Sequence, residues 1–328
     1  MVESGVPILG SLYVYAPNKP AAIFFTIAYA ITAALHIWQC YRYKSWKLIG
    51  LHPFCATLFT LGYALRIWGA DNCMYIPTNK LPLVLFIISQ ICIFVGPPFL
   101  ELANYHVLGR IFQYVPYASP FNPGRVTAFF GGLMALVEGL NGAGVSLSAN
   151  ANARESSKQA GHNLILVAFA LQVFVILVFA YLAVTFHCRC VKARAPAQAK
   201  LVKSTLTTLY LSMTLIFVRC LYRLVENSLG TTSVDLLSME ALMKLSPILR
   251  YESYFYVFEA SLMLVNSVLW NDGTEVERED EASERRPLLL TMVNTLLFGL
   301  LIRDDKRDSY GQSHELHENA RGNGHAKH

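Results

Sequence analysis

Apolar residues dominate seven stretches of the chain, and each stretch has the length that a helix needs to cross a lipid bilayer. A membrane-spanning helix takes about 20 mainly apolar residues, because each residue adds about 1.5 Å along the helix axis. The stretches are 21–41, 47–69, 81–103, 126–147, 163–187, 204–227 and 251–270. This pattern predicts an all-α, polytopic membrane protein whose transmembrane domain, residues 21–270, is a bundle of seven helices.

Basic residues are distributed unequally between the loops, which predicts the orientation of the bundle. The basic loops carry Arg42, Lys44 and Lys47, then Arg110 and Arg125, then Arg189, Lys192, Arg194, Lys200 and Lys203. Loops rich in Lys and Arg remain in the cytosol. We therefore expect the N-terminal segment, residues 1–20, to lie outside the cell and the C-terminus to lie in the cytosol, with the plasma membrane as the location.

The composition changes abruptly after the last stretch. Residues 271–328 contain an acidic run followed by a segment rich in Gly, His and Asn, which predicts a mostly disordered cytosolic tail. Within it, residues 288–302 are apolar but too few for a comfortable span. We expect them to form an interfacial helix in preference to an eighth span, which would reverse the C-terminus.

Composition and missing motifs exclude several classes of function. Hydrophobic residues make up 54% of the chain and charged residues 15%, against about 25% charged in soluble domains. The net charge of +5 is modest and dispersed, so we expect no nucleic-acid partner. The chain lacks a phosphate-binding P-loop, so we expect no ATP. Since no metal-ligand set or nucleophile–base pair stands out, we expect no metal, no cofactor, no catalytic residue and no enzyme activity.

Charged residues inside apolar stretches are the candidate site, because charges in a membrane normally face a protein interior and find partners. Six polar residues repeat one helical spacing: Arg219, Arg223 and Glu226 on the sixth stretch, and Glu252, Tyr256 and Glu259 on the seventh. Matching depths predict two ion pairs between these antiparallel helices, Arg219–Glu259 and Arg223–Glu252. Arg66 of the second stretch lies at a similar shallow depth.

Two interpretations of these charges remain open. The ion pairs either lock the bundle, or they line a polar cavity for an amphiphile with a charged head group. In the fourth stretch, Glu138 and Asn141 lie near mid-depth, and we expect Glu138 to be protonated and structural. Small residues at every fourth position beside them predict close helix packing: Gly131, Ala135, Gly139 and Ala143.

Two further polar groups lie nearer the helix ends. Glu101, near the predicted inner end of the third stretch, should reach interfacial water, and Pro97 and Pro98 before it should kink the helix. His36, Gln39 and His52 should form a polar contact that holds the first two helices together.

Several separated motifs resemble those of the fungal Rta-like, lipid-translocating exporter family. They are His36-Ile-Trp-Gln, Arg42-Tyr-Lys-Ser-Trp46, Gly62-Tyr-Ala-Leu-Arg66, Gly96-Pro-Pro, Asn104-Tyr-His-Val-Leu-Gly-Arg110, Leu171-Gln172, Val218-Arg-Cys-Leu-Tyr-Arg223 with Glu226, and Glu252 to Tyr256-Val-Phe-Glu259. The resemblance covers about residues 10–270. It implies a seven-helix membrane protein linked to the export or flipping of sphingoid bases and other toxic amphiphiles, with roles in stress and drug resistance.

The expected function is therefore lipid or amphiphile translocation, with membrane lipids or amphiphilic small molecules as partners. Glu252 and Glu259 would attract a cationic amine head group, while the arginines hold these acids in place. The full candidate substrate-binding set is Glu252, Glu259, Tyr256, Arg219, Arg223, Glu226, Arg66, Glu138 and Asn141. The alternatives are a lipid-sensing seven-helix receptor or regulator, and a porphyrin or haem transporter.

Overall fold

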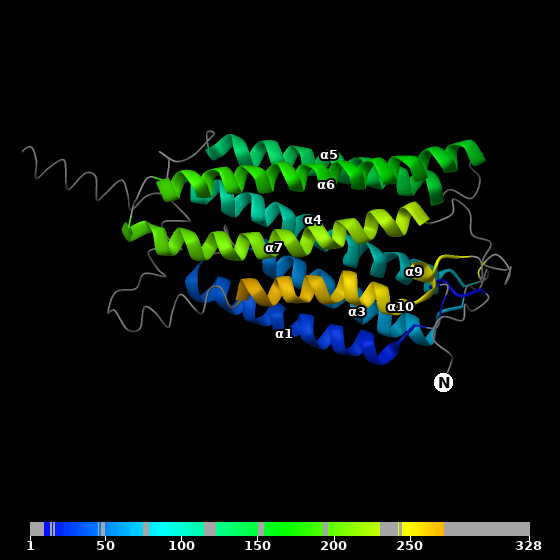
Figure 1. Cartoon of the computed structure of the whole chain (residues 1–328). Coiled ribbons are helices and arrows are strands. Elements are labelled where there is room, and N and C mark those ends of the chain that lie inside the picture. Colours follow the sequence, from blue (N-terminus) through cyan, green and yellow to red (C-terminus); the bar gives the residue numbers. More distant parts are fainter. Residues whose placement is uncertain are drawn as a thin grey trace, which may run out of the picture.

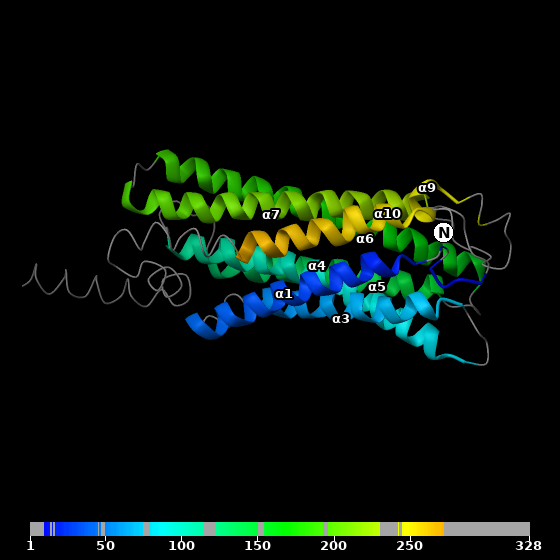
Figure 2. The same ribbon diagram turned by 90° about the horizontal axis from the view of Figure 1, so that it is seen from below.

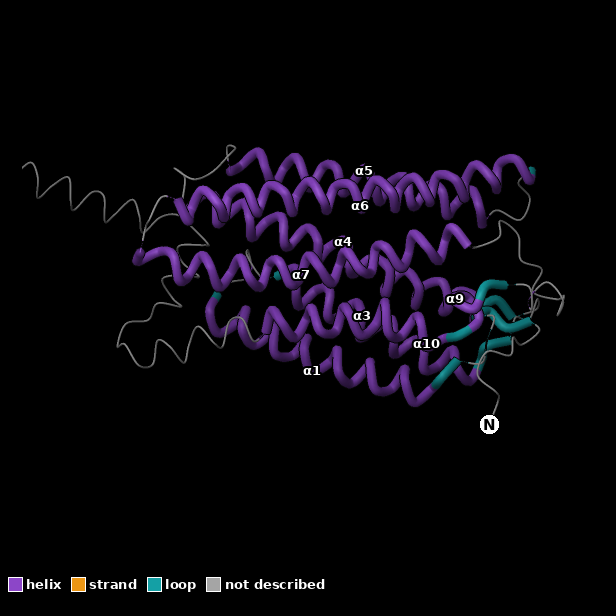
Figure 3. Tube along the Cα trace, in the orientation of Figure 1, coloured by secondary structure: helices purple, strands orange, loops and turns teal. Residues whose placement is uncertain are grey.

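The structure is a computed structural model, and it describes a bundle of long helices. It describes residues 10–13, 15, 17–44, 46, 50–74, 79–114, 123–149, 154–192, 196–229, 242 and 245–271. The described residues are almost all helical (Figure 3), apart from short loops and an isolated antiparallel bridge between Ser11 and Met74. The expected tail, 271–328, with its possible interfacial helix at 288–302, lies outside the described residues except for Asn271.

The prediction of seven helices is confirmed, and most of them are longer than the apolar stretches. Their bounds are α1 (Lys19–Tyr43), α3 (Leu51–Asp71), α4 (Leu81–Tyr114), α5 (Pro123–Ala149), α6 (Glu155–Lys192) and α7 (Pro196–Leu229). After the short α9 (Pro247–Arg250), a last helix runs continuously through α10 (Glu252–Phe255), the π-helical turn η1 (Tyr256–Ser261) and residues 262–271. We call this last segment, 252–271, helix seven.

Five described helices are long and apolar enough to cross a membrane on their own composition, namely α1, α4, α5, α6 and α7. The other two are more polar or less regular. In α3, the apolar character is interrupted by His52 and Arg66, which are both buried inside the bundle. Helix seven is divided by its π-helical turn. Both of these helices nevertheless lie among the long helices, and their axes follow the long axis of the bundle (Figures 1 and 2).

The outer surface of the bundle is apolar, as contact with lipid requires. The side chains of Phe24, Phe129 and Phe174 are each 61% exposed, and many Ile, Leu and Val side chains are exposed beside them. In water, so large an apolar surface would be costly, whereas hydrocarbon solvates it. Polar side chains are instead turned inward, because the bilayer core offers them no hydrogen-bond partners. The protein is an integral, multi-pass membrane protein.

Successive helices are antiparallel neighbours, so the bundle has two distinct ends. We call the end at which α1, α4, α6 and helix seven begin the N-side, and the opposite end the C-side. Helices α1, α3 and α4 pack in sequence, and α5 packs along α6 and α6 along α7. In Figure 1, α5 and α6 form one edge of the bundle and α1 lies at the other.

The closest helix packing involves α5 and α6, at a position that the sequence did not indicate. A Cβ atom added to Gly144 would lie 2.8 Å from the Gly161 carbonyl oxygen, and one added to Gly161 would lie 2.7 Å from the Gly144 carbonyl oxygen. The predicted packing stripe is wrong, since Ala135, Gly139 and Ala143 are exposed. A spacing of four drifts around a helix of 3.6 residues per turn, so the stripe rotates away from the neighbouring helix.

Candidate ionic site in the bundle interior

Helix seven positions its acids in two directions. It begins at Glu252, after the extended residue Tyr251, and it widens at Tyr256–Ser261 into a π-helical turn. Ser261 Oγ donates to the Tyr256 carbonyl oxygen at 2.9 Å, which stabilises the wider turn. Because a π turn holds more residues than an α turn, Glu259 faces α7 while Glu252 and Tyr256 reach Arg66 of α3.

Glu259 is fully buried and binds two arginines of α7. Arg219 Nε and Nη2 each lie 2.8 Å from Glu259 Oε1, and Arg223 Nε donates to Glu259 Oε2 at 2.8 Å. Both carboxylate oxygens are therefore paired with guanidinium groups. The predicted Arg219–Glu259 ion pair is confirmed.

Arg223 does not pair with Glu252, so that part of the prediction is wrong. Its second acid is Glu226, one turn further along α7, at 2.5 Å from Nη1. The Arg223 guanidinium also lies over the Phe94 ring, 3.9 Å from its centroid. Glu226 accepts a further hydrogen bond from Tyr222 Oη at 3.3 Å, and its side chain is 20% exposed. Local pairing along α7 thus replaces the expected contact between helices.

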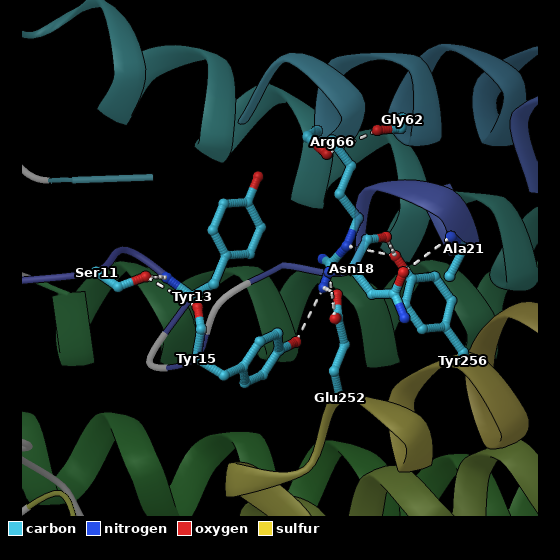
Figure 4. Close-up of polar contacts among 10 residues, drawn as sticks. Ser11, Tyr13, Tyr15, Asn18, Ala21, Gly62, Arg66, Glu252 and Tyr256 are labelled. Carbon is cyan, nitrogen blue, oxygen red and sulfur yellow. Dashed lines mark hydrogen bonds and ion pairs between the residues drawn. The ribbon is translucent and has the colours of Figure 1, made fainter. Parts of the chain in front are cut away.

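Glu252 pairs with Arg66 instead, at the N-side of the bundle (Figure 4). Arg66 Nη2 lies 2.7 Å from Glu252 Oε1 and donates to Tyr15 Oη at 2.9 Å. Arg66 Nε donates to Tyr256 Oη at 3.3 Å. The backbone N–H of Asn18 donates to Glu252 Oε2 at 2.6 Å. Tyr15 and Asn18, which precede α1, therefore both contact this ion pair.

Aromatic rings enclose the Arg66 guanidinium and leave its side chain 1% exposed. Its Cζ atom lies 4.4 Å from the Phe255 ring centroid and 4.8 Å from that of Tyr13. Burial raises the pKa of the Tyr13 phenol, although the Arg66 charge opposes this effect. Tyr13 is therefore a neutral hydroxyl near neutral pH and adds no charge to the site.

The ionic site has equal numbers of positive and negative groups. Its ion pairs join three guanidinium groups to three carboxylates: Arg66 with Glu252, and Arg219 and Arg223 with Glu259 and Glu226. Buried pairs of this kind break even in stability more often than they contribute to it, because both ions lose their hydration. A cationic ligand would have to replace a guanidinium group on one of these acids, and it would add one positive charge to the site because the displaced arginine stays in the chain.

Glu138 and Asn141 lie apart from these ion pairs, on α5. Both are half-buried, and the Glu138 side chain is hydrogen-bonded to Asn141. Among the ion pairs of the described residues, none includes Glu138. Arg219 nevertheless acts on Glu138 electrostatically. The structure thus relates Glu138 to the candidate site through Arg219 alone.

Glu101 is a buried acid whose position the sequence analysis misjudged. It does not reach interfacial water, because it is fully buried and α4 continues beyond it to Tyr114. Gln172 Nε2 of α6 donates to Glu101 Oε2 at 2.8 Å, and Tyr105 Oη of α4 donates to Oε1. The available signal was Gln172, an amide in the middle of the apolar stretch 163–187.

The polar contact expected of the first two helices is present and includes helix seven. The His36 and His52 rings stack with centroids 5.6 Å apart, and His52 packs against Trp270 at 4.9 Å. His36 Nε2 lies 3.2 Å from Ser267 Oγ. Within the described residues, no group of three or more His, Cys, Asp or Glu side chains is placed to hold a metal ion.

The fold and its interior define a class: an α-helical, multi-pass membrane protein with paired charges buried between its helices. The chain belongs to the RTA1-like protein family, whose model matches residues 53–273. This range contains all nine candidate substrate-binding residues and Glu101. No solved structure matches the chain.

Two fungal relatives carry the same descriptive name, lipid-translocating exporter-like protein RTA1. The one from Leptosphaeria maculans is 67% identical over 345 aligned residues, which cover all of this chain and 66% of the relative. The one from Ajellomyces capsulatus is 27% identical over 253 residues, covering 68% of this chain and 75% of the relative. The chain therefore spans about two thirds of the first relative's length.

Proposed function

We propose that this protein moves a single-chain amphiphile with a cationic head group, such as a sphingoid long-chain base, across the membrane for export. The names of the relatives support lipid translocation in general. In a cell, this activity would contribute to resistance to membrane-active stress and drugs. Membrane lipids or amphiphiles are then the partners, and neither nucleic acid nor ATP takes part.

The observation that carries the proposal is the pairing of the buried Glu259 with two guanidinium groups. A primary ammonium group can take the place of one guanidinium group on Glu259, because the other guanidinium group keeps the carboxylate paired. In this exchange Glu259 stays paired with two cations throughout. In this proposal, the amine first contacts Glu226 and Glu252, whose side chains are 20% and 10% exposed. It then binds to Glu259.

Two buried polar atoms near Glu259 suit the hydroxyl groups that flank the amine of a sphingoid base. Arg223 Nη2 and Tyr63 Oη have no hydrogen-bond partner among the described residues. Tyr63 lies within electrostatic range of Glu259. Unpaired buried polar groups are costly, so a ligand that hydrogen-bonds to them gains affinity. Tyr256 and Arg66 would hold Glu252 in place, and Glu138 and Asn141 would influence the site through Arg219.

The orientation is proposed from the basic loops. The N-side of the bundle, which carries Glu252 and Arg66, would face outward, and the C-side would face the cytosol of a cell whose plasma membrane holds the protein. An amphiphile would then reach the acids from the outer half of the bilayer while its tail stays in lipid.

Reconstitution tests the proposed function. Purified protein in sealed vesicles should speed the crossing of a labelled sphingoid base over protein-free vesicles, and it should not speed its N-acetylated analogue, which has no cationic group. Equal crossing rates with and without protein would contradict the proposed translocation. If the protein binds the base without moving it, the lipid-sensing receptor is the better account.

A further inference from the structure

Glu101 differs from the acids of the ionic site because its hydrogen-bond partners are neutral. Glu226, Glu252 and Glu259 each pair with an arginine. Glu101 is as fully buried as Glu259, yet it accepts hydrogen bonds from the Tyr105 hydroxyl and the Gln172 amide. No ion pair of the described residues includes Glu101. The proposed binding of the head group does not use Glu101.

Among the described residues, Arg219 is the cation that acts on Glu101. It acts electrostatically, although its guanidinium group is bound to Glu259. The titratable or charged groups that face Glu101 are Tyr105 on its own helix, Glu138 on α5, and Arg219 and Cys220 on α7, while Gln172 faces it from α6.

Complete burial without an ion-pair partner among the described residues favours a protonated Glu101. An ionised carboxylate buried with only neutral hydrogen-bond donors is expensive, so such an acid retains its proton. If Glu101 loses that proton, its carboxylate competes with Glu259 for the Arg219 guanidinium. Glu259 then keeps Arg223 alone and becomes available to another cation.

We propose that Glu101 is a proton-binding site whose proton excludes the cationic head group from Glu259, because only the Glu101 carboxylate would draw Arg219 away from Glu259. This inference rests on the proposed function and gives it a coupling ion. When the ammonium group pairs with Glu259, Arg219 pairs with the Glu101 carboxylate, and the Glu101 proton passes to the solution. One positive charge enters the buried site and one leaves it.

The exchange defines the transport mode as the antiport of one amine cation against one proton. Since the net charge moved is zero, a pH gradient drives it and the membrane potential does not. A protein working in this way would accumulate the amine on the acidic side of the membrane.

Binding of a single-chain primary amine at a series of pH values tests the inference, over the range in which the amine stays protonated. Protein in lipid nanodiscs should bind the amine about tenfold more tightly for each unit of rising pH while Glu101 is protonated, because one proton is displaced per amine. Proton release into a weakly buffered solution should accompany binding.

The variant Glu101→Gln mimics the protonated acid. It should bind the amine weakly at every pH, without proton release, whereas Glu101→Asp should retain the pH dependence. Wild-type binding that does not change with pH would overturn the inference but leave amine binding intact. Loss of the pH dependence in Glu138→Gln, with its persistence in Glu101→Gln, would also overturn it. An absence of amine binding at all pH values would instead refute the proposed function.

Infrared spectroscopy of the amine-free protein gives a measurement that needs no ligand. Glu101→Gln should remove a carbonyl stretch of a protonated carboxylic acid that is present in the wild type. Adding the amine to the wild type should remove the same band. If the substitution leaves the band unchanged, Glu101 carries no proton, and the inference fails whatever the protein transports.

Discussion

Arg219 and Arg223 lie one helical turn apart on α7 and together bind both oxygens of a buried carboxylate. Two guanidinium groups on one acid form an arrangement from which one can be withdrawn without leaving the acid unpaired. Arg223 already divides its donors between Glu259 and Glu226. At this scale, the chemistry that we propose is an exchange of partners among charges that remain buried throughout.

Substitution of Arg66 tests how much the Arg66–Glu252 ion pair contributes to the stability of the fold. Arg66→Ala would leave Glu252 without its buried cation, and breaking such a pair costs about 3–5 kcal/mol. We expect a clear fall in the thermal unfolding midpoint in detergent. Arg66→Met combined with Glu252→Gln should recover much of it, because neither charge is then left alone. A double variant no more stable than Arg66→Ala would show that packing, not charge, dominates there.

The charged residues of the site were easier to predict from the sequence than their ion-pair partners. Matching depths on antiparallel helices correctly paired Arg219 with Glu259, since each depth follows from counting residues along a straight helix. Arg223 and Glu252 also match in depth, but the π-helical turn gives Glu252 a different direction and brings it to Arg66. Glu101 was misjudged because α4 extends beyond its apolar stretch to Tyr114.

At the scale of helices, α5 and α6 approach closely because neither Gly144 nor Gly161 has a side chain. The carbonyl oxygen of each lies within 2.8 Å of the position that a Cβ of the other would take. Small residues at every fourth position suggested such an interface but misplaced it along α5. The fold class and the order of the helices were predictable from apolar length, whereas the rotation of each helix about its axis was not.

Gly161→Ala tests this contact, because its Cβ would clash with the Gly144 backbone. The helices would have to separate, and overpacking of this kind costs about 1–3 kcal/mol. The unfolding midpoint should fall. Gly139→Ala is the matched control, since nothing lies within 4 Å of a Cβ there, and alanine favours a helix over glycine by up to about 1 kcal/mol. Equal midpoints for the two variants would contradict the described packing.

For the whole molecule, the decisive feature is the contrast between an apolar surface and an interior that holds paired charges. The two ends of the bundle are also chemically distinct. The N-side carries the Arg66–Glu252 pair in contact with Tyr15 and Asn18, and the C-side carries the His36–His52 stack beside Trp270. The proposed translocation depends on which of these ends faces outward.

Two natural cysteines allow the orientation to be measured. Cys73 follows α3 at the N-side and is half-buried, while Cys188 is exposed near the C-side end of α6. On intact cells, a membrane-impermeant thiol reagent should label Cys73 and leave Cys188 unlabelled until the cells are opened. Cys73→Ser should abolish the labelling of intact cells. Labelling of Cys188 from outside would reverse the proposed topology.

The central claim, that Glu259 receives the cationic head group, is tested most directly by efflux of a labelled sphingoid base from cells that carry equal surface amounts of each variant. Glu259→Gln should lower the efflux rate at least about tenfold, since a tenfold change corresponds to only about 1.4 kcal/mol. Glu155→Gln, at an exposed acid at the start of α6, should match the wild type. Unchanged efflux by Glu259→Gln at equal expression would contradict the account.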